Sequence, residues 1–252
     1  MTDPSTELAP LRREIADACR VLAARGLADG FLGHVSLRVD ERRLLVRCRG
    51  PEERGLAWTT EDDVRLVTLD GDPGAPGELK GWTPPNELPL HAEVLRVHPD
   101  VNAVVHAHPP AVVAADLAGA RIRPIVGAFD IPGARLAAGG VPVYPRAVLI
   151  RDRSLAADMV RAMGDRPVVV LRGHGVASRG SDVPEAVLRS VSVDRIARLS
   201  LDVLSAGGEL SDLPAEDLAE LPDLGPAFNR GVAWRHELAR LSDEPDKEGV
   251  PR

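Results

Sequence analysis

The chain alternates short apolar segments with longer amphipathic ones, and this alternation constrains its fold more than any other feature. Residues 35–39 carry apolar side chains at every second position, and 64–72 begin with a similar short run, as strands do. Residues 6–27 and 183–207 instead repeat apolar side chains every three or four positions, which is typical of a helix with one buried face. Gly or Pro separates most of these segments. Strands and helices mixed in this way predict an α/β fold.

The remaining segments continue the mixture without a division into two domains. The strands at 35–39 and 42–49 are joined only by a polar turn, which predicts a hairpin. Because we find no internal repeat and no linker between two cores, we expect one domain over residues 1–240 and a polar C-terminal tail over 241–252. The other expected strands are 101–108, 142–150 and 166–176, the other expected helices are 86–100, 111–119 and 153–164, and residues 71–85 are expected to form an irregular loop.

The composition is that of an ordinary globular protein. The 252 residues are 44% apolar and 27% charged, and the formal net charge of −7 argues against a nucleic-acid partner. The apolar runs are far shorter than the ~20 residues of a membrane span, and the N-terminal residues are polar, unlike those of a signal peptide. With only two cysteines, Cys19 and Cys48, these features predict a cytoplasmic protein that binds neither membrane nor nucleic acid.

Two histidines lie at the end of the apolar strand expected at 101–108. Side chains two positions apart in a strand point to the same face, so His106 and His108 would present neighbouring imidazoles. Neutral imidazoles are common ligands of zinc and similar cations. Separate hydrogen bonds near a strand end explain the pair equally well, so the pair alone leaves both interpretations open.

A third histidine favours the metal interpretation. His174 follows the most apolar strand of the chain and lies between Gly173 and Gly175, which allow the backbone to turn closely around a ligand. Catalytic metal sites commonly use three protein ligands and keep one position open. A solvated loop histidine would explain His174 alone, but three histidines at strand ends indicate a divalent metal site.

A glutamate precedes these histidines at the start of the helix expected at 86–100. Glu87 follows Asn86, which is a good N-cap residue, and His91 lies one helical turn later. A carboxylate at this end of a helix also complements the helix dipole, which is a purely structural explanation. The irregular loop before Glu87 and the histidine strand after it favour a carboxylate that reaches the metal site.

Three segments together resemble the class II aldolase/adducin family. They are PNELPLHAEVLRVHPDVNAVVHAHPP (residues 85–110), RGHGV (172–176) and GFLGHVSLRV (30–39), and the resemblance extends over about residues 10–205. It implies a class II aldolase-like domain with a central, mainly antiparallel sheet flanked by helices. It also implies a homo-oligomer, often a tetramer with active sites between subunits.

The same resemblance assigns roles to the residues singled out above. It implies that His106, His108 and His174 bind a divalent cation, with zinc favoured over manganese, iron or cobalt, and that Glu87 is the catalytic acid/base. Adducin-like members of the family are structural proteins that lack this full set. The intact set therefore favours an enzyme over a non-catalytic interaction protein.

The chain departs from the family's sugar-phosphate aldolases where those enzymes hold the phosphate. Their Gly-Asn turn, Thr-Pro-Ser/Thr-Gly loop and Ser-Ser pair are replaced here by Gly33-His34, residues 47–50 and Pro85-Asn86. The tyrosine that donates a proton in those aldolases is also missing from residues 124–132, and Tyr144 lies on a later expected strand. A phosphorylated sugar is therefore disfavoured as the substrate.

The replaced positions predict a different kind of ligand. A guanidinium binds a planar carboxylate through two parallel hydrogen bonds, so Arg49 is expected to anchor a substrate carboxylate, although a solvated hairpin would also explain it. His34 is expected to act as a donor or acid to an anionic or phenolic group, although packing on the turn would also explain it. Gly50 and Asn86 complete the predicted substrate-binding set.

Among family members, the chain is most similar to the decarboxylase branch, in RCRGPEERGL (47–56), NELPLH (86–91) and FDIP (129–132). This similarity implies a metal-dependent carbon–carbon lyase that decarboxylates a hydroxylated aromatic dicarboxylate such as 3,4-dihydroxyphthalate. The metal would stabilise the carbanion or enolate left when CO₂ departs, and Glu87 would act as acid/base. The alternatives are a sugar-phosphate aldolase or epimerase, and an oxygenase with iron bound by the three histidines.

Overall fold

Seven strands form one sheet at the centre of the computed structural model, which describes residues 4–242. Their order across the sheet is β3-β2-β1-β4-β7-β6-β5. Only the β5–β6 pair is parallel, and the other five neighbouring pairs are antiparallel. The expected α/β fold with a mainly antiparallel sheet is therefore confirmed. The strands are β1 (His34–Arg38), β2 (Arg43–Arg47), β3 (Val64–Thr68), β4 (Ala103–Ala107), β5 (Val143–Tyr144), β6 (Val168–Leu171) and β7 (Gly175–Gly180).

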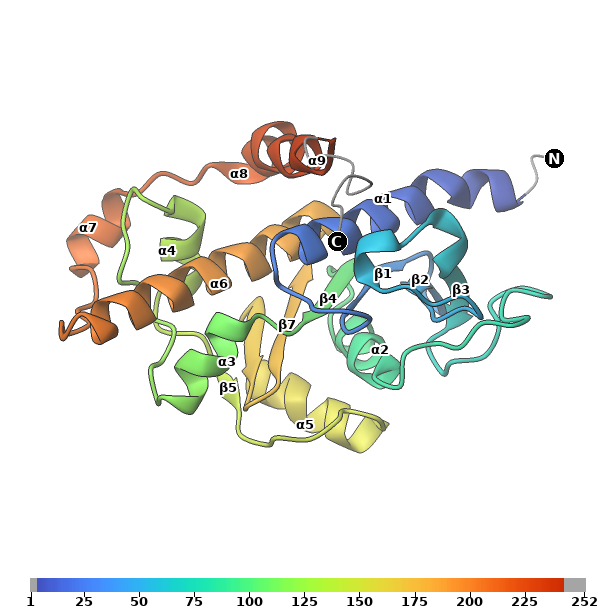
Figure 1. Ribbon diagram of the computed structural model, residues 1–252, viewed down its shortest axis with the longest axis horizontal. Coiled ribbons are helices and arrows are strands. Elements are labelled where there is room, and N and C mark those ends of the chain that lie inside the picture. Colours follow the sequence, from blue (N-terminus) through green and yellow to red (C-terminus); the bar gives the residue numbers. More distant parts are fainter. Residues whose placement is uncertain (1–3, 243–252) are drawn as a thin grey trace, which may run out of the picture.

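Helices flank this sheet, and α6, the longest of them, crosses it in orange in Figure 1. The side chain of Asp182 caps α6 by accepting a hydrogen bond from the Glu185 backbone N–H, as expected for a helix that begins at the predicted residue. The described helices are α1 (Pro4–Ala24), α2 (Leu88–Val97), α3 (Pro110–Leu117), α4 (Ile131–Ala137), α5 (Arg153–Met163), α6 (Val183–Ser205), α7 (Ala215–Glu220), α8 (Gly225–Phe228) and α9 (Arg235–Ser242), with short 3₁₀ turns η1 (Leu56–Trp58) and η2 (Glu61–Asp63) and a π turn η3 (Asn229–Trp234). No helix in the part of the chain that the structure describes is long and apolar enough to cross a membrane.

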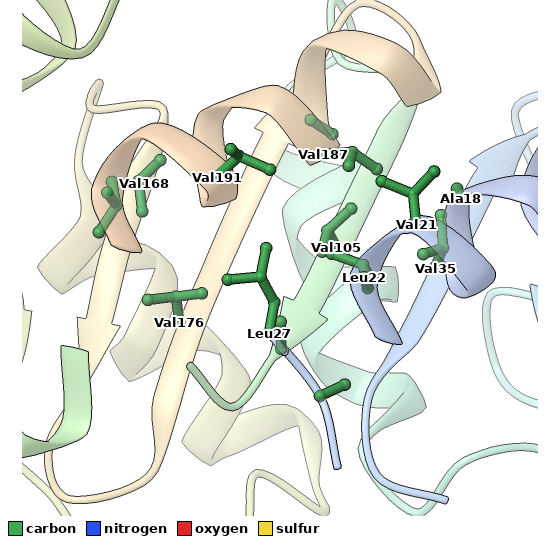
Figure 2. Close-up of a cluster of buried hydrophobic side chains, with 14 of the residues drawn as sticks. Ala18, Val21, Leu22, Leu27, Val35, Val105, Val168, Val176, Val187 and Val191 are labelled. Atoms are coloured by element: carbon green, nitrogen blue, oxygen red, sulfur yellow. The ribbon is translucent and has the colours of Figure 1, made fainter. Parts of the chain in front are cut away.

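One face of the sheet packs on α1, α3 and α6. Figure 2 shows Val105 and Val176 from the strands beneath Val187 and Val191 of α6, with Leu22 of α1 beside them. These five side chains are buried and belong to one apolar cluster. Burying a side chain of this size contributes roughly 1.5–3 kcal/mol, so this face holds much of the stability of the fold.

The opposite face packs on α2 and α5, and it is only partly apolar. Val104 and Val169 of the strands join an apolar cluster with Leu95 of α2 and Met159 of α5. In β4, side chains alternate between the faces, so His106 shares the α2 face with Val104. The strand register places His34 opposite His106 on this same face.

The segment 166–176 is not a single strand, which corrects the sequence-based expectation. It contains β6, a turn and the first residues of β7, which pairs antiparallel with β6. Gly173 adopts a left-handed conformation (φ 57°) in this turn, and the His174 N–H donates to the Leu171 carbonyl at 3.0 Å. Apolar residues on both sides of the turn hid it in the sequence.

The strand expected at 142–150 is also mostly wrong. Only Val143 and Tyr144 pair with β6, and Pro145 follows them. Because proline has no N–H and restricts the residue before it, the ladder does not continue past Tyr144. Residues 145–151 instead form an irregular segment, which proves important for the site.

The C-terminal region contains helices that the sequence patterns did not predict. The helix α9 packs on α1, where Glu237 is buried and forms an ion pair with Arg25. The tail expected at 241–252 begins within α9, which extends to Ser242, and residues 243–252 lie outside the described part.

Candidate active site

Three histidines and one glutamate meet at the end of β4, on the α2 face of the sheet. One ligand atom from each of Glu87, His106, His108 and His174 lies within 4.8 Å of the corresponding atom of every other member. Glu87 and His106 are buried, whereas His108 and His174 are half-buried. The four side chains expected to form a metal site are therefore neighbours in space, with the group open on the side of two histidines.

The pairing of β4 with β7 brings His174 to the other two histidines. Ala107 is the register partner of Val176, so the turn before β7 lies against the end of β4. Gly175 is required there, because a Cβ at this position would overlap the Ala107 carbonyl oxygen. The glycine beside His174 thus permits a close approach of two backbones.

Asp116 of α3 holds the same turn from the outside. Its Oδ2 accepts a hydrogen bond from the Gly173 N–H at 2.8 Å, and its Oδ1 lies 3.9 Å from Arg172 Nε. The Asp116 carboxylate thus ties the turn that carries His174 to α3. Nothing in the sequence pattern singled out this residue.

The orientation of His106 is set by a backbone carbonyl. Its Nδ1 donates to the Val176 carbonyl at 2.9 Å, because a carbonyl can only accept. This hydrogen bond leaves Nε2 of His106 directed at the group, 2.8 Å from His108 Nε2 and 3.0 Å from Glu87 Oε2. A backbone carbonyl on the distal nitrogen is the arrangement that fixes the tautomer of metal-binding histidines.

Glu87 is held by a backbone amide and not by its helix. Glu87 occupies the N-cap position of α2 but makes no side-chain capping bond, and Asn86 is exposed, so the expected Asn86 cap is wrong. Glu87 Oε1 accepts a hydrogen bond from the Ile150 N–H at 2.9 Å, and Glu87 Oε2 lies 3.6 Å from His174 Nε2. Burial alone would raise the pKa of Glu87, but the hydrogen bond and the charge of His106, followed by the Ile150 N–H, lower it to about 2.

The electrostatics of the histidines suit a cation. Burial and, after it, the neighbouring His106 lower the pKa of His108 to about 3. The pKa of His174 is lowered by the same two causes in the same order. Neutral imidazoles and one ionised carboxylate are the donor types that divalent transition metals bind, so the residues fit such a cation.

His34 lies beside this group and belongs to a buried chain of polar side chains. Its Nδ1 is 2.7 Å from His91 Nε2, and His91 Nδ1 is 2.7 Å from Ser36 Oγ. The His34 and His106 rings are 5.0 Å apart between centroids. Burial and then the neighbouring His91 hold the pKa of His34 well below its usual value, and burial lowers the pKa of His91 to about 3.

Besides Asp116, the sequence patterns missed three contributors to the site. His91 was predicted to lie one turn after Glu87, but no role in the site was predicted for it. Ser36 carried no signal beyond the alternation of its strand. In the irregular segment 145–151, the Ile150 N–H donates a hydrogen bond to Glu87.

The arginine and glycine expected to bind substrate lie beyond the end of β2. Arg49 is half-buried, and its backbone pairs with Thr83 through two hydrogen bonds of 2.9 Å. This pairing sets Arg49 beside the loop that leads to Glu87. Gly50 has a structural explanation, because a Cβ there would overlap the ring of Trp82. Arg47 is buried in an ion pair with Glu53.

Comparison with known proteins agrees with this arrangement. The family described as Class II Aldolase and Adducin N-terminal domain matches residues 13–201. The match extends over most of the chain and includes all four members of the group. The chain therefore belongs to the class II aldolase and adducin family.

Individual relatives are similar over nearly the whole chain. A 3,4-dihydroxyphthalate decarboxylase from Terrabacter sp. (strain DBF63) is 74% identical over 230 residues, which cover 91% of this chain and 96% of that protein. A 3,4-dihydroxyphthalate decarboxylase from Arthrobacter keyseri is 70% identical, over 92% of this chain and 94% of that protein. An aldolase II superfamily protein from Pseudomonas syringae has the same fold, with a TM-score of 0.78 at 21% identity over 96% of this chain and 94% of that one.

Proposed function

We propose that this protein is a metal-dependent decarboxylase that acts on 3,4-dihydroxyphthalate. The observation that carries the proposal is the group of three imidazoles and one ionised carboxylate at the end of β4. The substrate is supported by the decarboxylases that are 70% and 74% identical over more than nine-tenths of the chain. The replaced phosphate-binding positions, Gly33-His34 and Pro85-Asn86, favour this substrate over a sugar phosphate.

His106, His108 and His174 would hold the divalent cation. Zinc is favoured, with manganese, iron and cobalt as alternatives, because imidazoles bind all four metals. When bound, the cation would act as a Lewis acid toward the substrate oxygens and stabilise the negative charge that develops as CO₂ leaves.

Glu87 would move the proton that replaces the carboxylate. Loss of CO₂ from an aromatic carbon leaves an electron pair on that carbon, and a proton must be delivered there. Because the Ile150 N–H holds Oε1 and the carboxylate is ionised, Oε2 would first accept a proton from a substrate hydroxyl or a water and then donate it to the carbon. The oxygen that gave its proton to Glu87 regains one from water, so the proton count balances.

Four further residues would bind the substrate. Arg49 would pair with the carboxylate that is retained, and its backbone pairing with Thr83 places it beside the loop that precedes Glu87. Asn86 is exposed next to Glu87, and His34 lies beside His106. Gly50, which has no side chain, would contribute through its backbone.

The test is to load the protein with zinc, add 3,4-dihydroxyphthalate and follow CO₂ release together with the aromatic product. We expect release that a chelator abolishes and that zinc restores. Absence of turnover in a protein shown to contain metal would overturn the proposed substrate. Cleavage of a sugar phosphate, or consumption of dioxygen by the iron-loaded protein, would identify the aldolase or the oxygenase alternative.

We also propose that residues 1–240 form one domain and that the protein is a cytoplasmic homo-oligomer, a tetramer by family resemblance. Cys19 and Cys48 are free and buried, which suits a reducing compartment.

Phe31 and Trp58 are large apolar side chains with more than half of their surface exposed, which suits a surface that another subunit covers. Light scattering gives the oligomer size, and a monomer at working concentration would contradict this assignment.

A further inference from the structure

The loop that leads to Glu87 carries a tryptophan that lies flat against the backbone beyond β2. A Cβ at Gly50 would overlap three consecutive atoms of the six-membered ring of Trp82, Cε3, Cζ3 and Cη2, at nearly equal distances. An approach from the edge of the ring would bring one atom much closer than its two neighbours. Gly50 therefore lies against the face of the indole, and a residue with a side chain does not fit there unless the ring moves.

Arg65 of β3 holds the same ring. Its Cζ lies 4.1 Å from the centroid of the Trp82 ring, which is the geometry of a cation–π interaction. Within residues 4–242 the Arg65 side chain forms no ion pair and no hydrogen bond, and its Nε is fully buried. Because a cation that is partly withdrawn from water needs a favourable partner, the indole face is the interaction that explains the position of Arg65.

The segment that carries Trp82 is itself fixed to the sheet and to α1. Glu78 Oε2 accepts a hydrogen bond from the Leu66 N–H of β3 at 3.0 Å, and Glu78 Oε1 accepts one from Arg12 of α1. The Trp82 N–H donates to the Leu79 carbonyl at 3.1 Å. The ring is therefore held by β3 and α1, independently of the segment against which it packs.

That segment contains the arginine expected to bind substrate. Arg49 and Thr83 exchange two backbone hydrogen bonds of 2.9 Å, so residues 49–50 are fixed to residues 82–83 at two consecutive positions. The Arg49 side chain is half-buried, and among the described residues it has no ion pair and no hydrogen bond. Its guanidinium is therefore available to a ligand, while its backbone is held in place.

The same segment leaves the sheet at the end where the metal group lies. Ser36 and Val46 are register partners in β1 and β2, and Val46 belongs to the apolar cluster of the α2 face. Two residues before Ser36, His34 is the register partner of His106 and points to this face as well. Because β1 begins where β2 ends, Arg49 follows β2 on the side of the metal group.

We propose that Trp82 and Arg65 are positioning residues that hold the Arg49–Gly50 segment so that Arg49 pairs with the carboxylate that the substrate retains. A guanidinium binds a carboxylate through two parallel hydrogen bonds, and this geometry tolerates little movement of the backbone that carries it. Neither Trp82 nor Arg65 contacts the substrate, since both act through the supported segment. The inference rests on the proposed function for the identity of the substrate.

The first measurement is calorimetric binding of phthalate and of benzoate to the zinc-loaded protein. Both acids lack the ring hydroxyls of the proposed substrate, and phthalate has the second carboxylate that benzoate lacks. A charge-assisted hydrogen bond is expected to favour phthalate by roughly 10- to 100-fold in the wild type, and Arg49→Ala should abolish this preference. Equal affinity of the wild type for the two acids overturns the inference.

Variants of the ring and of its cation test the positioning role. Trp82→Ala should lose most of the preference for phthalate, whereas Trp82→Phe keeps an aromatic face and should keep most of it. Arg65→Met should reduce the preference about 2- to 10-fold, and it tests the inference even if Trp82→Ala does not fold. A wild-type preference in Arg65→Met overturns the role of Arg65. The matched control is Arg43→Met at the opposite end of β2, which should behave as the wild type.

A double-mutant cycle separates positioning from a general structural effect. If Trp82 acts through Arg49, adding Trp82→Ala to Arg49→Ala should weaken phthalate binding no further, and zinc content should be the same in all variants. An equal loss of phthalate affinity in the presence and absence of Arg49 overturns the inference, because it shows that the ring supports the site without regard to Arg49.

Turnover distinguishes failure of this inference from failure of the proposed function. Absence of turnover of 3,4-dihydroxyphthalate by the zinc-loaded wild type would overturn the proposed function, while the calorimetric comparison still decides the roles of Trp82 and Arg65. In an active enzyme, Arg65→Met should raise KM about 2- to 10-fold with kcat unchanged, because the retained carboxylate is bound equally before and during the reaction. A fall in kcat with unchanged KM would contradict the positioning role.

Discussion

The two faces of the sheet bury different kinds of side chains, although the same strands form both. Val35 of β1 and Val105 of β4 point toward α1 and α6 and join an apolar cluster. One residue away in each strand, His34 and His106 point to the α2 face, where they meet the Glu87 carboxylate and the other histidines. The pleat of the strands therefore separates the residues that stabilise the protein from those expected to carry its chemistry.

The largest expected effect comes from removing chemical groups on the α2 face. His106→Ala should lose bound metal and turnover together, because it removes a ligand at the centre of the group. Glu87→Gln should keep the metal but lower kcat by about 10²- to 10⁴-fold, since it removes the acid/base while preserving the shape of the side chain. Metal analysis and steady-state kinetics measure both. Normal turnover by Glu87→Gln would contradict the role proposed for Glu87.

The converse substitution on the other face should change stability without changing the chemistry. Leu22 of α1 is fully buried in the apolar cluster, so Leu22→Ala should lower the free energy of unfolding by about 2–5 kcal/mol. Turnover per folded molecule should equal that of the wild type. Denaturant unfolding and active-site titration check the two halves of this prediction, and a large fall in kcat would show that the two faces are coupled.

Acid should destabilise the metal-free protein through the α2 face. His108 has a pKa of about 3 in the folded protein, whereas its pKa in the unfolded chain is about 6.5. Between these two values only the unfolded chain binds a proton at His108, so the free energy of unfolding falls by about 2 kcal/mol at pH 5. Glu87, with a folded pKa of about 2, stabilises the fold above its unfolded pKa and loses this contribution as the pH falls further toward 2. Unfolding of the chelator-treated protein at pH 7 and pH 5 measures the first effect. His108→Gln should reduce the difference, and an unchanged difference would contradict the assignment.

The smallest expected effect lies in the support of the His174 turn. Asp116→Ala removes the acceptor of the Gly173 N–H, so zinc affinity should fall, but by less than the roughly 10- to 100-fold typical of losing a direct partner of a metal-binding histidine. Zinc titration with a competing chelator measures the affinity. The matched control is Asp158→Ala, which removes a surface ion pair with Arg161 and should leave zinc affinity unchanged. Equal affinities in the two variants would show that the turn holds without Asp116.

Local patterns in the chain were enough to predict most of the fold. Apolar spacing predicted α1, α5 and α6, because the periodicity of a helix that packs on a sheet is visible in its own residues. The turn at Gly173 and the end of β5 at Pro145 were missed, since a run of apolar residues does not reveal where pairing stops. Beyond α6, η3 packs against α6 and α9 packs against α1 through contacts distant in sequence, so no local signal predicted them.

The site divides in a similar way. The chain alone indicated which side chains have metal-binding chemistry, because His106 and His108 share a strand face and the glycines beside His174 permit a tight turn. Only the folded structure decided that His91 joins His34 and that Ile150 holds Glu87. The physical reason is that residue type and spacing determine chemistry and local geometry, whereas a hydrogen-bond partner depends on strand register and helix packing between segments far apart in the chain.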